Sequence, residues 1–237
     1  MKKIVFSFIP ALCTIILLST CQNNTPKALK EKVLTAAEQK ALTPEMVLQS
    51  LKDGNKRFMS NNTTARDHSA MVRDAAAGQY PKAVILSCID SRIPVEDVFD
   101  KGIGDLFVGR VAGNFVNEDL LGSLEYGCKI SGAKLILVMG HESCGAIKAA
   151  IDHVKLGNIT SMLTKIEPAV IRSNSFKGKH TSKNKGYVEC VAKNSIVNTM
   201  ETIKLKSPIL KEMADKGEIK IVGAYYNIHT GEVNFIE

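Results

Sequence analysis

Two cysteines and one histidine lie in two short segments whose residue types and spacing could build a metal site. The first segment is Ser87–Arg92 (SCIDSR), and the second is Gly140–Gly145 (GHESCG). Cys88, His141 and Cys144 together offer two thiolates and one imidazole, which are ligand types that zinc prefers. Three protein ligands leave a fourth position open, and an open position distinguishes a catalytic zinc from a structural one. The two segments therefore predict a catalytic zinc site.

One carboxylate and one guanidinium follow the first cysteine closely. Asp90, two residues after Cys88, can accept a hydrogen bond from a zinc-bound hydroxide and so aim a lone pair at a substrate. Arg92 can hold this carboxylate by a bidentate contact, which fixes its rotamer and keeps it ionised. Zinc lowers the pKa of a bound water to near neutrality, so the site can supply hydroxide at ordinary pH. The alternative is that Asp90 only caps a turn and Arg92 is its surface partner.

Both segments follow short apolar runs rich in branched residues, Ala83–Leu86 and Leu135–Val138. Such runs are typical of strands that are buried on both faces of a parallel sheet. Ligand sites in open α/β sheets usually lie at the carboxyl ends of the strands. The ligands are therefore predicted at that edge of a parallel sheet.

The rest of the chain alternates predicted strands with predicted helices. A helix begins at Pro44 with Thr43 as its N-cap, and its apolar residues share one face. Further helices are predicted over Ser69–Ala77, Pro94–Phe99, Glu118–Ile130, Cys144–Leu156, Ser161–Ile171, Tyr187–Leu205 and Pro208–Lys216, and strands over Ala83–Ser87, Asp105–Val111, Lys134–Met139, Ile219–Tyr226 and Glu232–Ile236. This alternation predicts an α/β fold with a parallel centre.

Composition indicates one domain with an aliphatic core. The chain has 237 residues, 45% of them hydrophobic, and no tryptophan. The formal net charge is +7, and much of it comes from the stretch 177–185. We interpret this stretch as a solvated loop and expect no nucleic-acid binding, because no recognition motif accompanies the charge. Cys128 and Cys190 fall in predicted helices and are expected to be buried small residues, not a disulfide. His68, His153, His180 and His229 are expected on the surface or in loops.

The N-terminus has the features of a secretory signal. Lys2 and Lys3 precede an apolar stretch over residues 4–18, which is too short for a comfortable membrane span. Leu18–Cys21 (LSTC) resembles a bacterial lipoprotein cleavage box, in which the cysteine is lipidated. We therefore expect a signal peptide over 1–20, a lipidated tether and linker over 21–41, and a location on the periplasmic side of a bacterial membrane, anchored at Cys21. An ordinary signal peptide or a retained anchor are the alternatives.

Cys-x-Asp-Ser-Arg, followed about fifty residues later by His-x-x-Cys, resembles the β-class carbonic anhydrases. The likeness extends from roughly Leu42 to Phe235 and includes the segments 104–114, 122–126, 223–226 and 230–233. The resemblance implies one zinc per chain and the reversible hydration of carbon dioxide to bicarbonate and a proton. It also implies that Asp90 either orients the hydroxide or, in closed forms, leaves Arg92 and becomes the fourth zinc ligand.

The resemblance assigns roles to three further residues and to a partner subunit. Gln79 is implied to donate to the substrate, and Phe107 and Tyr126 to form the apolar wall of the pocket. A homodimer or a dimer of dimers is implied, with active sites at the dimer interface and N-terminal helices wrapped on the partner, so that Gln79 would meet the zinc of the partner. Because 61–64 is loop-like, we expect the Pro44–Met59 helix to pack away from its own sheet.

Residues and resemblance together predict an α/β domain over 42–237. Its mostly parallel central sheet has four to five strands flanked by helices, with an N-terminal helical arm and a C-terminal β-hairpin. Two alternatives to carbon dioxide hydration remain open from the sequence. One is hydrolysis of another heterocumulene, carbonyl sulfide or carbon disulfide, at the same site. The other is a non-catalytic zinc or redox module using Cys88 and Cys144, which the Asp90–Arg92 pair argues against.

Overall fold

A five-stranded sheet forms the centre of the domain in the computed structural model, which describes residues 32–236. The strand order is β2-β1-β3-β4-β5; the first four strands are parallel and β5 is antiparallel to β4. The strands are β1 (Ala83–Ser87), β2 (Leu106–Arg110), β3 (Leu135–His141), β4 (Lys220–Tyr226) and β5 (Val233–Ile236). The predicted parallel centre and C-terminal hairpin are confirmed.

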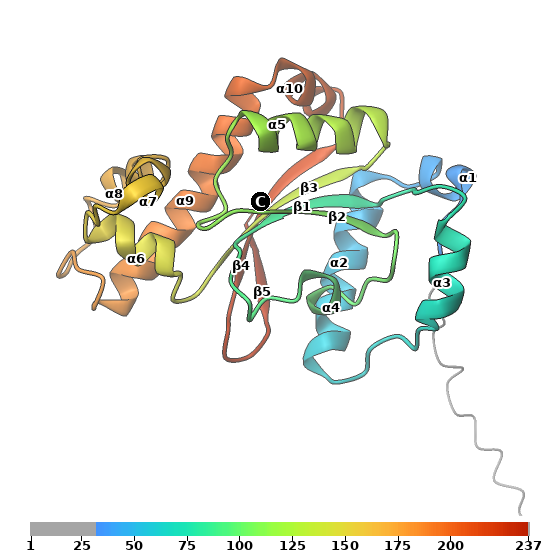
Figure 1. Ribbon diagram of the computed structural model, residues 1–237, viewed down its shortest axis with the longest axis horizontal. Helices are drawn as coiled ribbons and strands as arrows, with labels where there is room; N and C mark the ends of the chain where they lie inside the picture. The colour runs from blue at the N-terminus through green and yellow to red at the C-terminus, as the bar shows by residue number, and fades with distance from the viewer. Residues whose placement is uncertain (1–31, 237) are drawn as a thin grey trace, which may run out of the picture.

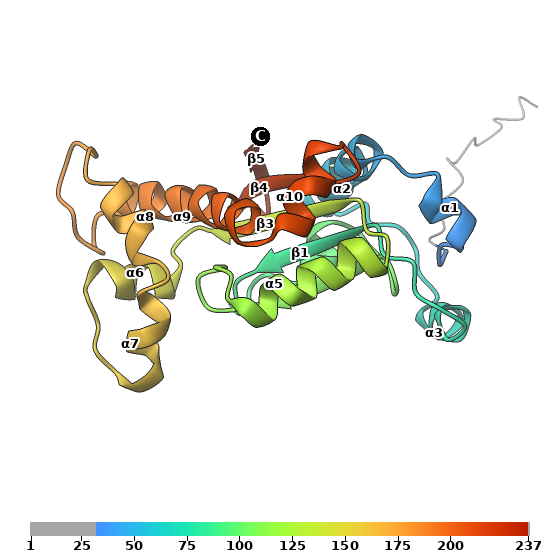
Figure 2. The ribbon, with the colours of Figure 1, turned by 90° about the horizontal axis from the view of Figure 1, so that it is seen from above.

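Helices cover both faces of this sheet (Figure 1). They are α1 (Ala36–Lys40), α2 (Pro44–Met59), α3 (His68–Ala75), α4 (Val95–Val98), α5 (Glu118–Glu125), the π-helical turn η1 (Tyr126–Ile130), α6 (Gly145–Ile151), α7 (Gly157–Leu163), α8 (Glu167–Arg172), α9 (Lys185–Lys206) and α10 (Pro208–Asp215). Helices α5, α9 and α10 lie on one face, and α2 and α4 lie on the other. Helices α6, α7 and α8 extend beyond one end of the sheet, and α1 and α3 lie beyond the opposite end (Figure 2).

The buried strands divide their side chains between two cores. In β1, Val84 and Leu86 pack in the core under α5 and α9, and Ala83 and Ile85 pack in the core under α2 and α4. Every residue of β1 and β3 is buried. A strand covered on both faces needs apolar residues at every position, which explains the continuous apolar runs in the sequence.

Helix α2 packs on its own sheet, so the prediction that it packs away from that sheet is wrong. Its N-terminus is as predicted, because the hydroxyl of Thr43 accepts a hydrogen bond from the amide of Met46 at 3.2 Å. Its apolar residues Val47 and Leu51 are buried against β1, β3 and α4. Amphipathicity indicates that one face must be covered, but it does not indicate whether the same chain covers it.

Two close contacts hold α2 in that position. A Cβ atom at Gly54 would lie 1.8 Å from the carbonyl oxygen of Phe99, so only glycine permits this approach to the end of α4. The side chain of Asn55 donates to the carbonyl of Gly231 at 2.8 Å and accepts from the amide of Val233 at 2.9 Å. The second contact ties α2 to the turn before β5, which lies far away in the sequence.

Three predicted helices differ from the observed ones. The helix predicted over Ser161–Ile171 is two helices, α7 and α8, because Pro168 lies in the first turn of a new helix, where its missing amide hydrogen costs least. The helix predicted to start at Cys144 ends at Ile151, and His153 then takes a left-handed φ of 52°. The helix after Asn117 changes to the π-helical turn η1 at Tyr126.

Cys128 is buried as expected, whereas Cys190 is only partly buried, and the basic stretch is exposed as expected. Cys128 and Cys190 form no disulfide. Burial raises the pKa of Cys128 to about 12, so this thiol stays neutral in the core. The lysines at 177, 179, 183 and 185 are exposed at or just before the start of α9, and the four histidines outside the site are exposed.

Within residues 32–236, no helix has both the length and the apolar character needed to cross a membrane. The expected signal peptide and the lipidated Cys21 lie outside the described residues.

Candidate metal centre

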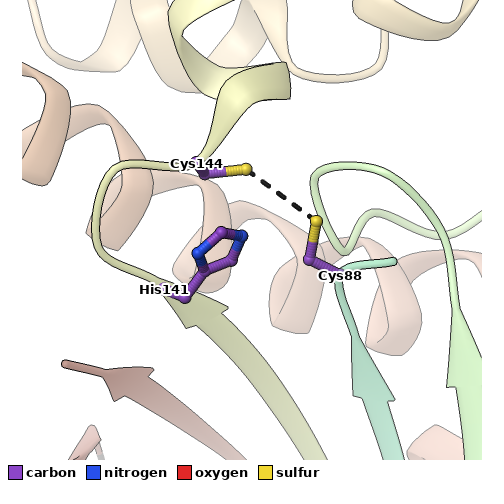
Figure 3. Close-up of side chains that lie close together, drawn as sticks. All are labelled: Cys88, His141 and Cys144. Atoms are coloured by element: carbon purple, nitrogen blue, oxygen red, sulfur yellow. Dashed lines mark hydrogen bonds between the residues drawn. The ribbon is translucent and has the colours of Figure 1, made fainter. Parts of the chain in front are cut away.

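Three elements bring the predicted ligands together (Figure 3). Cys88 directly follows β1, His141 is the last residue of β3, and Cys144 is the N-cap of α6. Strands β1 and β3 are neighbours and run parallel, so their carboxyl ends meet at the same edge of the sheet. The prediction that the ligands gather at this edge is confirmed.

The donor atoms of these residues are spaced as a tetrahedral metal requires. The Sγ atoms of Cys88 and Cys144 lie 4.0 Å apart, and they and a ring nitrogen of His141 all lie within 4.8 Å of one another. Two sulfurs that are each about 2.3 Å from a tetrahedral zinc lie about 3.8 Å from one another. The observed spacing is therefore close to that of a zinc site.

The imidazole of His141 is oriented as a ligand. Its Nδ1 donates to the main-chain carbonyl of Glu142 at 2.9 Å, which leaves the lone pair on Nε2. This Nε2 is buried, with no hydrogen-bond partner among the described residues. Buried polar atoms are rarely left unpaired, and a carbonyl bond on the second nitrogen is common for metal-bound histidines. A metal ion would satisfy Nε2, so the site fits a zinc.

The two thiols shift each other's pKa in opposite directions. The pKa of Cys88 is lowered, chiefly because the thiol of Cys144 donates to it. The pKa of Cys144 is raised for the reciprocal reason, and burial raises it further. A divalent cation between the sulfurs favours ionisation of both, so metal binding releases a proton.

Asp90 and Arg92 form the predicted bidentate pair beside the ligands. Arg92 donates to Asp90 through Nε at 2.9 Å, through Nη2 at 2.7 Å and through its main-chain amide at 3.0 Å. These bonds hold the pKa of Asp90 well below its usual range. Its Oδ2 lies 3.9 Å from Nε2 of His141. The site therefore places an oriented carboxylate with a lowered pKa beside the metal position.

Two residues at and after the end of β2 also contact this site, and sequence reasoning did not single them out for it. Arg110 donates to the main-chain carbonyls of Cys88, Asp90 and Ile93. The amide of Gly113 donates to Sγ of Cys88 at 3.4 Å. Both lie in the segment 104–114, whose family likeness was the only signal for them.

Gln79, Phe107 and Tyr126 come together, but in a groove that contains none of the metal ligands. All three line a groove of about 670 Å³, and the rings of Phe107 and Tyr126 have centroids 6.4 Å apart. The groove is open to solvent where Tyr126 lines it, because Tyr126 is 52% exposed in the single chain. The chain thus separates its predicted substrate residues from its metal ligands.

Comparisons with known proteins agree with this geometry. A family model described as carbonic anhydrase matches residues 83–233. Carbonic anhydrase 2 of Mycobacterium tuberculosis (strain H37Rv) is 32% identical over 197 residues, covering 79% of this chain and 90% of the relative.

Two solved structures share the fold. The β-carbonic anhydrase CcaA superposes with a TM-score of 0.64 at 24% identity, over 80% of this chain and 95% of that chain. One of two tetrameric β-carbonic anhydrases of Sordaria macrospora superposes with a TM-score of 0.63 at 19% identity, over 81% of this chain and 95% of that chain. This chain belongs to the β-class carbonic anhydrase family.

Proposed function

We propose that this protein catalyses the zinc-dependent, reversible hydration of carbon dioxide to bicarbonate and a proton. Cys88, His141 and Cys144 hold one zinc per chain. The observation that carries the proposal is the buried Nε2 of His141, which has no hydrogen-bond partner within residues 32–236. It lies beside two sulfurs and 3.9 Å from the carboxylate of Asp90. The names of the relatives, carbonic anhydrases, support the same reaction.

The residues around the metal position orient the reacting water. When bound, zinc supplies Lewis acidity that lowers the pKa of water toward neutrality, an effect known from carbonic anhydrases that hold zinc by three histidines. Asp90 accepts a hydrogen bond from the attacking water, because its own pKa is too low for it to carry a proton. Arg92 fixes the carboxylate of Asp90. The carboxylate in turn aims a lone pair of the attacking water oxygen at the carbon of carbon dioxide.

The alternatives fit less well. A structural zinc site or a redox pair has no use for an ionised carboxylate held by a bidentate arginine beside the metal position. Hydrolysis of carbonyl sulfide or carbon disulfide uses the same kind of attack, and no observation on this chain favours either substrate. Carbon dioxide is therefore the substrate that we assign.

Removing one thiolate should remove the metal. In Cys144→Ser, we expect zinc content and hydratase activity to fall together by about tenfold or more, because a hydroxyl is a poor zinc ligand beside a thiolate. Elemental analysis of purified protein measures the zinc. Cys190→Ser is the control, because Cys190 lies on α9 and is not part of the ligand cluster. Full zinc occupancy in Cys144→Ser would refute the ligand assignment.

Asp90→Asn should keep zinc but lose turnover. The amide fills the same space, but its NH2 group can donate to the water instead of accepting, and it has no charge to pair with Arg92. We expect kcat to fall by about a hundredfold, measured by stopped-flow carbon dioxide hydration at equal zinc content. Asp53→Asn, on the exposed face of α2, should match wild type. If Asp90→Asn turned over at the wild-type rate, Asp90 would have only a structural role.

We further propose that the enzyme assembles as a homodimer or a dimer of dimers, with Gln79 of each chain serving the metal site of the other. Strand β2 is an edge of the sheet, and an unpaired edge is usually covered. The groove with Gln79, Phe107 and Tyr126 lies against this strand, open to solvent and separate from the metal ligands. The tetrameric relative of Sordaria macrospora supports assembly in general.

Shared sites can be tested by complementation. Gln79→Ala and Cys144→Ser chains, each expected to be strongly impaired alone, are coexpressed with different tags, and mixed dimers are purified. Each mixed dimer would contain one intact site, so we expect about half of wild-type activity from purified mixed dimers. Isolated mixed dimers without recovered activity would contradict sharing, and light scattering showing an active monomer would exclude the assembly.

We also propose that the mature protein is exported and held at the periplasmic side of a bacterial membrane by lipid on Cys21. The support is the sequence of residues 1–21 alone: two lysines, an apolar stretch and the LSTC box. Several acyl chains anchor a protein firmly, whereas one chain does so only marginally.

Lipidation predicts membrane fractionation that depends on one thiol. Wild-type protein should sediment with membranes, and mass spectrometry should show a diacylglyceryl group on Cys21. Cys21→Ser should lose the lipid, whereas Cys190→Ser should keep it. An unmodified Cys21 in the mature wild-type protein would contradict the anchor.

A further inference from the structure

One side chain at the end of β2 holds the main chain of the loop that carries the first metal ligand. Arg110 is the last residue of β2 and pairs in register with Ser87. Its Nη1 donates to the carbonyls of Cys88 at 3.1 Å and Asp90 at 3.3 Å, and its Nη2 donates to the carbonyl of Ile93. Three carbonyls of the loop between β1 and α4 therefore point at one guanidinium.

We propose that Arg110 is a positioning residue for the reaction: it fixes the Cys88–Ile93 loop, and through the loop it sets Cys88 and Asp90 relative to the metal position. The bonds of Arg110 in the described part of the chain go to main-chain carbonyls, so it acts through the backbone. Arg92 fixes the side chain of Asp90. Arg110 fixes the main chain on which that pair is built.

The loop has few other main-chain bonds to hold its shape. Within it, the amide of Ile93 donates to the carbonyl of Asp90 at 3.3 Å, and the amide of Arg92 donates to the carboxylate of Asp90. The same carbonyl of Asp90 also receives Arg110. Removal of the guanidinium thus leaves the carbonyls of Cys88 and Ile93 without this partner and frees the loop to move with the Asp90–Arg92 pair intact.

The residues after Arg110 bind the end of β1 and the first residue of the same loop. The amide of Val111 donates to the carbonyl of Ser87 at 3.1 Å, and the amide of Gly113 donates to Sγ of Cys88. Cys88 is thus held at its carbonyl by Arg110 and at its sulfur by Gly113. The end of β2 forms a template against which the ligand loop is ordered.

Arginine is suited to this task where lysine is not. Its planar guanidinium carries five N–H donors in a fixed fork, so one side chain can bridge several carbonyls at defined angles. The ammonium of lysine is a compact charge on a flexible stem, and it cannot reproduce that fork. Hydrogen bonds from a charged donor are also stronger than neutral ones. A lysine at 110 should therefore restore only part of the effect.

The test compares Arg110→Met and Arg110→Lys with wild type. Arg172→Met is the matched control, because it makes the same substitution at an exposed arginine whose partner is the side chain of Glu201 on α9. The readouts are amide hydrogen exchange over 89–93 in the zinc-loaded protein, the rate of zinc transfer to a chelator, kcat and KM for carbon dioxide, and melting temperature.

Arg110→Met should show amide exchange over 89–93 and zinc transfer that are each about fivefold faster or more. Its kcat should be lower by about tenfold, with KM changed less than about twofold. Arg110→Lys should fall between Arg110→Met and wild type in loop exchange, zinc transfer and kcat. Arg172→Met should match wild type. If Arg110→Met does not fold, Arg110→Lys carries the same comparison.

A purely structural role would lower the melting temperature of Arg110→Met but leave its loop exchange, zinc transfer and kcat equal to those of Arg172→Met; that result would overturn the proposal. The kcat readout rests on the proposed hydratase function, whereas loop exchange and zinc transfer do not. An inactive wild type with faster loop exchange and zinc transfer in Arg110→Met would therefore refute the function and support the positioning role.

Discussion

Charge balance in a buried space is the constraint on which this site depends. Two thiols and an imidazole are almost fully buried at the edge of the sheet, where an isolated charge is costly. The negative charges of two thiolates balance the charge of a divalent cation, and the charge of Arg92 balances that of Asp90. Each negative group therefore has a positive one to balance it. This balance lets a carboxylate stay ionised beside a metal position.

The ligands and the strands beneath them could be predicted because the signals are local. The runs before Cys88 and His141 are apolar at every position, since both faces of β1 and β3 are covered. Parallel neighbours then bring the strand ends to one edge. Each short apolar run lies within a few residues of its ligand segment. The strands and the ligands could therefore be predicted without knowing which distant segments pack together.

The features that could not be predicted depend on which distant surfaces meet. The amphipathic face of α2 gave no indication that its own sheet would cover it, and the contact of Asn55 with Gly231 joins segments that no pattern links. Arg110 has no distinguishing pattern until the fold places three loop carbonyls before it. The substrate contacts that the resemblance implies for Gln79, Phe107 and Tyr126 stay a prediction, because the single chain places these residues in a groove that contains none of its own metal ligands.

The strand order has a practical consequence for attaching this enzyme to a solid material. Strand β5 is the edge opposite β2, and β1, β3 and β4 lie between them. Four strand spacings of about 4.8 Å separate the two edges by roughly 19 Å. A resin or fusion protein linked after β5 would therefore lie away from β2 and from the loop ordered against it. Attachment of the resin through side chains near β2 would place it against the strand whose Arg110 binds the ligand loop.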